Sequence, residues 1–363
     1  MRIGIDIRAL MEGRTTGVQV YITNLLHTLF KLDRSNQYIL FANSFRDIEN
    51  VLPQFHYANV ELKLFRYPNK TFNLAQKLGF PKIDRLLGGI DLFFAPHWRE
   101  VALSKSTPLV VTFHDLSFEI VPSFFTLWQR VWHKFMDYQG AAKRANKIIA
   151  VSENTKQDLV GLYNVPTDKI RVIHPGVHPA KFTDYNPKYF LFFGTFEPRK
   201  NLQTVLVAYE EYCEKSKVRL PLVLAGSSGW KSSLKIPTHL QDNIKVLQNV
   251  SEEHKIRLYE QAEALLFLSF YEGFGFPVLE AASIGVPIIA SAIPSLLEIA
   301  SDFAVFVNPF RSSQVAAAMI SVEEDESYRE MMRVRGIGAV KKYSWGKTAE
   351  ETLKLFNNIY LNK

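Results

Sequence analysis

The sequence predicts an α/β protein that is built from two doubly wound domains. Short apolar runs, typical of buried parallel strands, alternate along the chain with longer segments whose apolar residues have helical spacing. The length of 363 residues suits two domains of ordinary size. An apolar content of 47%, with 13% aromatic residues, is enough for two cores and excludes a disordered chain.

Composition also narrows the environment in which the chain works. Cys213 is the single cysteine, which excludes a disulfide framework and a thiolate metal cluster and favours a reducing compartment. The N-terminus has the pattern of a strand rather than of a signal peptide, and no apolar run could span a bilayer. We therefore expect a soluble, cytoplasmic protein. The net charge of +7 comes from residues 1–175 alone, which favours an anionic surface or acceptor beside the N-terminal half.

Residues 1–175 are expected to form the first domain. A loop at 12–17 leads into a helix at 18–32, and Gly17 places backbone N–H groups at the start of that helix. His114 and Asp115 stand at the end of a strand, where open parallel sheets bind ligands. A single histidine is more often structural, so a structural and a functional interpretation of this pair both stay open. The expected strands are residues 3–8, 38–42, 60–65, 91–96, 109–115, 148–153 and 170–177.

The segment 124–145 combines aromatic and basic residues in a helical pattern. Trp128 and Trp132 lie among the basic residues Arg130 and Lys134. We favour a core-facing aromatic stripe with a solvated basic face. The alternative is an interfacial surface that receives a lipid-linked acceptor.

Residues 176–344 are expected to form the second domain. Gly194 ends its first strand, Gly226 ends the next, and Arg199 with Lys200 stands at the head of a helix between them. Two fixed cations at a helix N-terminus suit the charge of a departing diphosphate. The expected strands are residues 189–194, 222–226, 244–251, 264–269 and 286–291, and an amphipathic helix follows at 345–360.

The largest concentration of potential ligand-binding residues lies between two glutamates, Glu272 and Glu280. An apolar strand precedes them, Gly273 and Gly275 form a loop whose backbone can approach a ligand, and Pro277 suits the first position of a helix. The helix N-terminus suits a phosphate, and carboxylates on either side of it can accept hydrogen bonds from sugar hydroxyls. A nucleoside diphosphate sugar has this polarity. The alternative is a helix cap with ordinary acidic residues in its first turn.

Residues 272–280 resemble the E-x7-E region of the retaining glycosyltransferases of family GT4, which have the GT-B fold. Residues 199–201 and 114–115 match further motifs of that family, whereas the loop around Gly17 departs from its pattern. The resemblance implies two Rossmann-like, doubly wound domains with an interdomain cleft. It also implies that a C-terminal helix at 345–363 crosses back to the first domain.

The same resemblance implies a retaining, metal-independent hexosyltransferase that needs no cofactor. It would move glucose or mannose from UDP-glucose or GDP-mannose to a saccharide or lipid-linked saccharide in polysaccharide biosynthesis. Nucleic acid would not be a partner, whereas peripheral contact with the anionic inner face of a membrane is expected. The implied catalytic residues are His114, Arg199, Lys200 and Glu272. The implied donor-binding residues are Gly17, Asp115, Gly194, Arg199, Lys200, Gly226, Val250, Glu272, Gly273, Phe274, Gly275, Phe276, Pro277, Val278, Leu279 and Glu280.

Within this set, Arg199, Lys200 and the backbone N–H groups at 274–279 would hold the diphosphate. Glu280 would bind the ribose and Glu272 the hexose. Two other functions stay open. One is a different GT-B activity such as a nucleotide-sugar epimerase, and the other is a non-catalytic protein that binds a sugar nucleotide or a polyanion.

Overall fold

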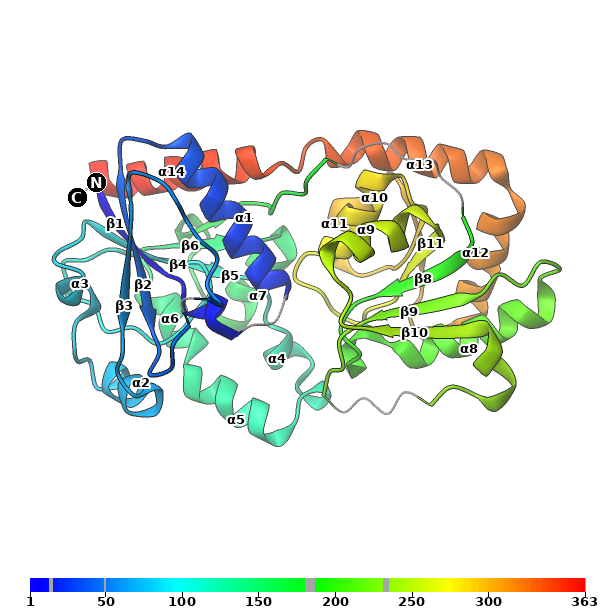
Figure 1. Ribbon diagram of the computed structural model, residues 1–363, viewed down its shortest axis with the longest axis horizontal. Coiled ribbons are helices and arrows are strands. Elements are labelled where there is room, and N and C mark those ends of the chain that lie inside the picture. Colours follow the sequence, from blue (N-terminus) through cyan, green and yellow to red (C-terminus); the bar gives the residue numbers. More distant parts are fainter. Residues whose placement is uncertain (13–15, 49, 180–186, 231–234, 363) are drawn as a thin grey trace. The chain divides into compact units, whose positions relative to one another are not determined.

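The computed structural model describes residues 1–12, 16–48, 50–179, 187–230 and 235–362, and it consists of two compact units (Figure 1). The first unit comprises Met1–Leu116, Val131–Gly176 and Tyr343–Lys363, and the second comprises Ser117–Arg130 and Val177–Lys342. Each unit contains a parallel sheet with helices, as the sequence predicts for an α/β protein. None of the described helices is long and apolar enough to cross a membrane.

The first unit is built on a seven-stranded parallel sheet in the order β3-β2-β1-β4-β5-β6-β7. β1 pairs with β2 on one side and with β4 on the other, so the strand order reverses beside β1. Most central strands are buried along their whole length, which explains their continuous apolar sequences. The strands are β1 (Arg2–Asp6), β2 (Gln37–Asn43), β3 (Val60–Phe65), β4 (Leu92–Ala95), β5 (Leu109–Phe113), β6 (Lys147–Ala150) and β7 (Ile170–Val172).

Helix α1 illustrates how local sequence sets the helix boundaries. Thr16 and Gln19 form a capping box, in which each side chain accepts a hydrogen bond from the other residue's backbone N–H. The helix therefore starts at Gly17, one residue before the expected start; residues 13–15 of the preceding loop lie outside the described residues. The helical elements up to residue 176 are η1 (Arg8–Glu12), α1 (Gly17–Leu32), α2 (Asn69–Lys77), α3 (Ile83–Leu86), α4 (Ser117–Ile120), η2 (Pro122–Phe124), α5 (Leu127–Met136), α6 (Tyr138–Arg144), α7 (Glu153–Tyr163) and η3 (Thr167–Lys169).

The expected helix at 124–145 is wrong in two respects. The chain breaks between α5 and α6 at Asp137, which has φ +48° and accepts a hydrogen bond from the backbone N–H of Gly140 through its side chain. The aromatic stripe of α5 also does not face a core, because Trp128 and Trp132 are exposed. An amphipathic pattern fixes which residues share a face of a helix, but it does not say what that face contacts.

The second unit is built on a six-stranded parallel sheet in the order β10-β9-β8-β11-β12-β13. β8 lies between β9 and β11, so the chain segments that follow these three strands leave the same edge of the sheet side by side. The strands are β8 (Tyr189–Phe193), β9 (Leu222–Gly226), β10 (Ile244–Gln248), β11 (Ala262–Phe267), β12 (Ile288–Ser291) and β13 (Ala304–Val307).

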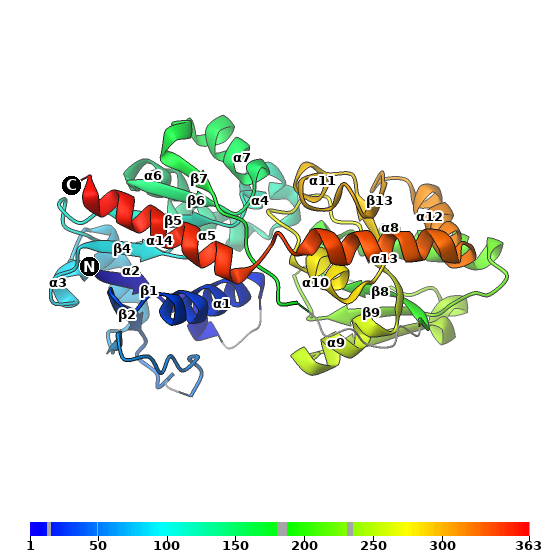
Figure 2. The same cartoon turned by 90° about the horizontal axis from the view of Figure 1, so that it is seen from above.

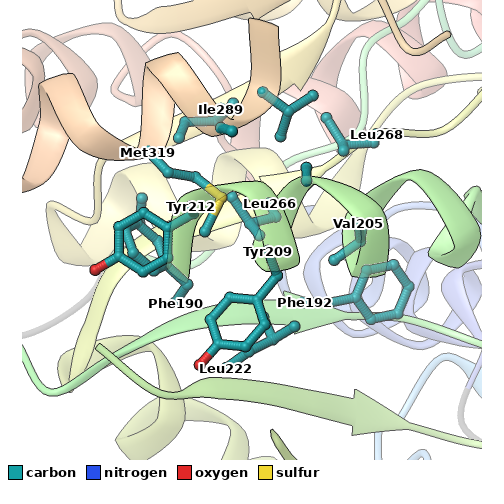
Figure 3. Packing of buried hydrophobic residues seen from close by; sticks show 14 of the residues in the cluster. Phe190, Phe192, Val205, Tyr209, Tyr212, Leu222, Leu266, Leu268, Ile289 and Met319 are labelled. Carbon is teal, nitrogen blue, oxygen red and sulfur yellow. The ribbon is translucent and has the colours of Figure 1, made fainter. Parts of the chain in front are cut away.

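The core of the second unit lies between the sheet and helices α8 and α12 (Figure 3). Tyr209 and Tyr212 of α8 are buried there. The hydroxyl of Tyr209 donates to the carbonyl oxygen of Leu220, and the hydroxyl of Tyr212 accepts from the backbone N–H of Leu220. These bonds satisfy two polar groups that would otherwise be costly to bury. The helical elements after residue 176 are η4 (Pro198–Lys200), α8 (Leu202–Lys215), η5 (Thr238–Asn243), α9 (Glu252–Glu260), α10 (Phe276–Ile284), α11 (Pro294–Ala300), α12 (Ser312–Glu324), α13 (Glu326–Val340) and α14 (Trp345–Leu361).

The C-terminal helix α14 returns to the first unit and packs beside α1 (Figures 1 and 2). The hydroxyl of Thr348 donates to the carbonyl oxygen of His174 at 2.8 Å, and the buried ring of Phe356 lies 5.2 Å from that of Phe94 on β4. The backbone of Trp345 also passes so close to Gly176 that a Cβ there would lie 2.2 Å from the Trp345 nitrogen. The helix is therefore an integral part of the first unit.

Phe356→Ala should lower the free energy of unfolding of the first unit by about 3–5 kcal/mol, because it leaves a cavity under α14. Chemical denaturation followed by circular dichroism measures this loss. Tyr360→Ala, on an exposed part of the same helix, is the control and should change the stability by less than about 0.5 kcal/mol. Equal effects of the two substitutions would contradict the packing of α14.

Candidate functional site

The edge of the second sheet is shaped by two glycines at neighbouring strand ends. Gly194 follows β8 with φ +155°, and Gly226 ends β9 with φ +153°. A Cβ on Gly226 would lie 1.9 Å from the carbonyl oxygen of Gly194. Position 226 must therefore be a glycine, because any larger residue would collide with the backbone of Gly194. Both glycines lie at the carboxyl ends of parallel strands, where such sheets bind ligands.

Arg199 and Lys200 lie on the short turn η4, not at the start of α8 as the sequence predicts. Asn201 separates them from the helix because it adopts the left-handed conformation, with φ +59°. Its side-chain amide donates to the backbone oxygens of Leu268, at 3.1 Å, and Pro309, at 2.8 Å. Asn201 thus fastens η4 to the loop after β11. Sequence reasoning quoted it only as part of a motif and missed this positioning role.

The two cations meet Glu272 in a buried cluster of charges. Lys200 Nζ lies 2.5 Å from Glu272 Oε1, and Arg199 Nη1 lies 3.0 Å from Glu272 Oε2. Arg199 also pairs with Glu197 at 2.5 Å and donates to the carbonyl oxygen of Tyr271 at 2.9 Å. Glu197 is buried and was not among the predicted site residues. The structure therefore brings the predicted diphosphate ligands and the predicted hexose ligand into direct contact.

The cluster keeps Glu272 ionised. Burial alone would raise the pKa of Glu272, but the charges of Arg199 and Lys200 outweigh it and lower the pKa from 4.5 to about 2. Burial raises the pKa of Glu197, against the opposing effect of the same two cations. Glu272 is thus a carboxylate at any physiological pH and acts only as a hydrogen-bond acceptor.

The helix after the glycine loop, α10, begins one residue earlier than predicted. Gly275 caps it with φ +117°, and Pro277 occupies the second helical position instead of the first. A Cβ on Gly275 would lie 2.7 Å from Leu296, so this glycine also permits the packing of α11. The side chains of Phe274, Val278 and Leu279 are buried. The backbone N–H groups of Val278 and Leu279 already donate to the carbonyl oxygen of Gly275, so these two of the predicted diphosphate donors are used inside the first turn of the helix. Phe276 and Pro277 are half-buried, and Gly273 is buried.

Glu280 belongs to a second and separate polar group. Its carboxylate accepts hydrogen bonds from Lys255 Nζ at 2.8 Å and from the hydroxyl of Tyr259 at 3.2 Å, both on α9. Burial alone would lower the pKa of Lys255, but Glu280 and Glu252 raise it. The sequence does not single out Lys255 and Tyr259, because they lie on α9, before β11 and the glutamate motif, and belong to no motif of their own. Val250 is half-buried just before Ser251, which caps α9.

The remaining predicted site residues, Gly17, His114 and Asp115, belong to the first unit. His114 follows β5, and its Nε2 lies 2.8 Å from the carbonyl oxygen of Pro96. Since a carbonyl oxygen can only accept, Nε2 carries the hydrogen and Nδ1 is the acceptor of a neutral ring. Burial lowers the pKa of His114, although Pro96 and Asp115 act in the opposite direction. Asp115 is half-buried beside it, and Gly17 is exposed at the start of α1.

Over the described parts of the chain, no three His, Cys, Asp or Glu side chains gather as metal ligands. The groups at the edge of the second sheet are instead cations, carboxylates and backbone N–H groups. Such a set suits a ligand that carries both a phosphate and hydroxyls.

Comparison with known proteins identifies the family. Residues 15–181 match the model of Glycosyltransferase Family 4, and residues 178–338 match that of Glycosyl transferases group 1. O-antigen chain mannosyltransferase B of Escherichia coli is 30% identical over 73% of this chain and 72% of its own length. The GDP-mannose:cellobiosyl-diphosphopolyprenol alpha-mannosyltransferase of Xanthomonas oryzae is 27% identical over 71% and 70%.

The fold agrees with this result. Sucrose-phosphate synthase from Thermosynechococcus elongatus superposes with a TM-score of 0.75 at 16% identity and covers 100% of both chains. The chain belongs to the group 1 glycosyltransferases of family GT4 and has their two-domain GT-B fold. The resemblance seen in the sequence is thereby confirmed.

Glu272→Gln should lower the free energy of unfolding of the second unit by about 3–5 kcal/mol, because it leaves two buried cations with too little negative charge. Thermal and chemical denaturation measure the loss. Glu253→Gln, which breaks an exposed ion pair with Arg257, is the matched control and should cost less than about 1 kcal/mol. A wild-type stability in Glu272→Gln would contradict the cluster.

The difference in unfolding free energy between the wild type and Glu272→Gln should depend on pH. Because the folded-state pKa of Glu272 is about 2 and its ordinary value is 4.5, its ionised form stabilises the fold fully above pH 4.5. This contribution is lost as the pH falls toward 2. The unfolding free energies of the wild type and Glu272→Gln should therefore converge between these pH values, and a constant gap would contradict the lowered pKa.

Proposed function

We propose that this chain is a hexosyltransferase that acts in polysaccharide biosynthesis. It transfers a hexose, with retention of the anomeric configuration and without a metal or cofactor, from a nucleoside diphosphate sugar to a saccharide or lipid-linked saccharide. GDP-mannose is the first donor to test, because both relatives described above are named for mannose transfer; UDP-glucose is the alternative. The name of the Xanthomonas relative, with its diphosphopolyprenol acceptor, supports a lipid-linked acceptor here.

The buried cluster of Arg199, Lys200 and Glu272 is the observation that carries this proposal. Together with Glu197 it holds two cations and two carboxylates, so its charges are balanced before a donor arrives. A donor diphosphate would draw Lys200 from Glu272, and the released carboxylate would accept hydrogen bonds from hexose hydroxyls. Lys200 would then pair with the diphosphate of the donor, and Glu272 would bond its hexose. Lys200 and Arg199 would then stabilise the charge that develops on the leaving phosphate.

The rest of the donor fits around this exchange. The N-terminus of α10 adds backbone N–H groups and a partial positive charge for the diphosphate. Glu280 would accept hydrogen bonds from the ribose hydroxyls, with Lys255 and Tyr259 holding its carboxylate in place. His114 would accept a hydrogen bond from a sugar hydroxyl at Nδ1, because its Nε2 hydrogen is used by Pro96.

Retention of configuration is proposed here because the matched family motif is that of retaining enzymes. Glu280 is held by Lys255 and Tyr259, and the Glu272 carboxylate released by the donor would be occupied by hexose hydroxyls, so we assign neither as the nucleophile that retaining glycosidases use. We therefore propose attack of the acceptor hydroxyl on the face from which the phosphate departs. The hydroxyl proton passes to the departing phosphate oxygen, the new glycosidic bond forms, and the bond between the hexose and the phosphate breaks.

Lys200→Met should weaken GDP binding by about 10- to 100-fold, the effect of one charged hydrogen bond, and should leave guanosine binding nearly unchanged. Glu280→Gln should weaken GDP and guanosine alike, because it acts on the ribose. The rise in melting temperature with GDP-mannose, UDP-glucose, GDP, UDP and guanosine measures both effects.

Arg257→Met, an exposed cation on α9, is the control and should bind every ligand as the wild type does. Full GDP affinity in Lys200→Met would contradict the diphosphate assignment. A donor that isomerises without an acceptor would contradict the transfer reaction.

A further inference from the structure

The segment Ser117–Arg130 packs in the second unit, although the residues before and after it in the chain belong to the first. Two consecutive aromatic residues, Phe124 and Phe125, attach it there. The buried ring of Phe125 stacks on the ring of Trp230, with centroids 5.6 Å apart, and Trp230 Nε1 donates to the carbonyl oxygen of Phe124 at 2.8 Å. The position of Phe124 is therefore set by the chain that follows β9.

The ring of Phe124 contacts the loop that carries Glu272. It stacks on the ring of Phe270, with centroids 5.5 Å apart and an angle of 25° between the rings. The ring of Phe310, after β13, lies 4.8 Å from Phe270 as well. Both separations are those of favourable aromatic pairs. Phe270 thus has aromatic neighbours from two other parts of the second unit.

The backbone around Phe270 is also held in place. Its N–H donates to the carbonyl oxygen of Arg199 at 2.9 Å, and Arg199 Nη1 donates to the carbonyl oxygen of Tyr271 at 2.9 Å. Glu272 follows directly, and Gly273 comes after it. Because glycine restrains the backbone least, the residues before Glu272 contribute more to its position than those after it.

This restraint matters most when a donor is bound. Lys200 and Arg199 both pair with the Glu272 carboxylate. In the proposed function, the donor diphosphate draws Lys200 from Glu272, so the carboxylate loses one of the two contacts that orient it. The backbone before Glu272 must then keep the carboxylate directed at the hexose, and Phe270 anchors that backbone. Such support from neighbouring residues is what a precise binding group requires.

We propose that Phe124 is a positioning residue for hexose transfer, because through Phe270 it fixes the loop from which Glu272 binds the hexose. The inference rests on the proposed function and deepens its donor site. The ribose end of that site does not depend on this loop, since Glu280 is held by Lys255 and Tyr259 on α9. Loss of the Phe124 ring should therefore affect the hexose half of the donor alone.

Phe124→Ala should weaken the binding of the nucleotide sugar about three- to tenfold relative to that of the nucleotide, which is the contribution of one aromatic pair. Binding of the nucleoside should stay unchanged. Calorimetric titration of the full chain with GDP-mannose, GDP and guanosine, and with UDP-glucose, UDP and uridine, measures these ratios. A merely structural role of Phe124 would weaken all three ligands of a series alike.

Two further variants of Phe124 separate the ring from its volume. Phe124→Tyr keeps the aromatic face and should restore the wild-type ratio. Phe124→Leu keeps most of the apolar volume without the aromatic face, so its ratio should lie between those of the wild type and Phe124→Ala; it also serves if the alanine variant folds poorly. Leu127→Ala, at a 73% exposed position of the same segment, is the control and should bind every ligand as the wild type does.

A double variant tests whether Phe124 acts through Phe270. Phe124→Ala combined with Phe270→Ala should change the ratio no more than Phe270→Ala alone, because both substitutions remove the same contact. Additive effects of the two substitutions would overturn the proposal. So would wild-type ratios in both Phe124→Ala and Phe124→Leu.

The same titrations separate this inference from the proposed function. A wild type that binds none of the nucleotide sugars would overturn the proposed function and this inference with it. A wild type that binds a nucleotide sugar, beside a Phe124→Ala variant with the same ratio, would overturn this inference alone.

Discussion

Four charged side chains, of which Glu197, Lys200 and Glu272 are buried and Arg199 is half-buried, constrain the candidate site of the second unit. Taking Arg199, Lys200, Glu197 and Glu272 out of water is expensive, and each charge is tolerated only because an opposite one lies within 3.0 Å. The partners come from the segments after β8 and β11. These segments meet because the two strands are neighbours in the sheet. The order of strands thus decides which charges meet, and the charges in turn fix the two loops against each other.

The two glutamates of the motif have different surroundings despite their regular spacing. Glu272 is held by cations from η4, whereas Glu280 is held by Lys255 and Tyr259 from α9. The N-terminus of α10 lies between them in the sequence, and Gly275 forms its cap. Each carboxylate is thereby presented with its orientation set by neighbours, which is the preorganisation that recognition of hydroxyls requires.

The exposed apolar residues of helix α5 contrast with this site. In the second unit the apolar residues of α8 are covered by the sheet and by α12 (Figure 3), whereas Leu127, Trp128, Val131 and Trp132 of α5 are exposed. Both helices have an apolar stripe of helical period. The difference lies only in what the tertiary structure places opposite that stripe, and this is why the favoured core-facing interpretation of α5 was wrong.

Sequence alone determined what depends on local spacing: the alternation of strands and helices, the strand–glycine loop–helix motif from Glu272 to Glu280, and the family. It also placed the ends of most of the strands it identified, and of the helices at 18–32 and 345–360, within a few residues. Only the tertiary structure decided which residues far apart in the sequence meet, such as Glu280 with Lys255 or Glu272 with Lys200. It also decided that Arg199 and Lys200 lie on a turn held by Asn201, since that turn depends on carbonyl oxygens of other elements. Local propensities act through neighbours along the chain, but ion pairs and exposed faces depend on sheet order and on packing, which no spacing encodes.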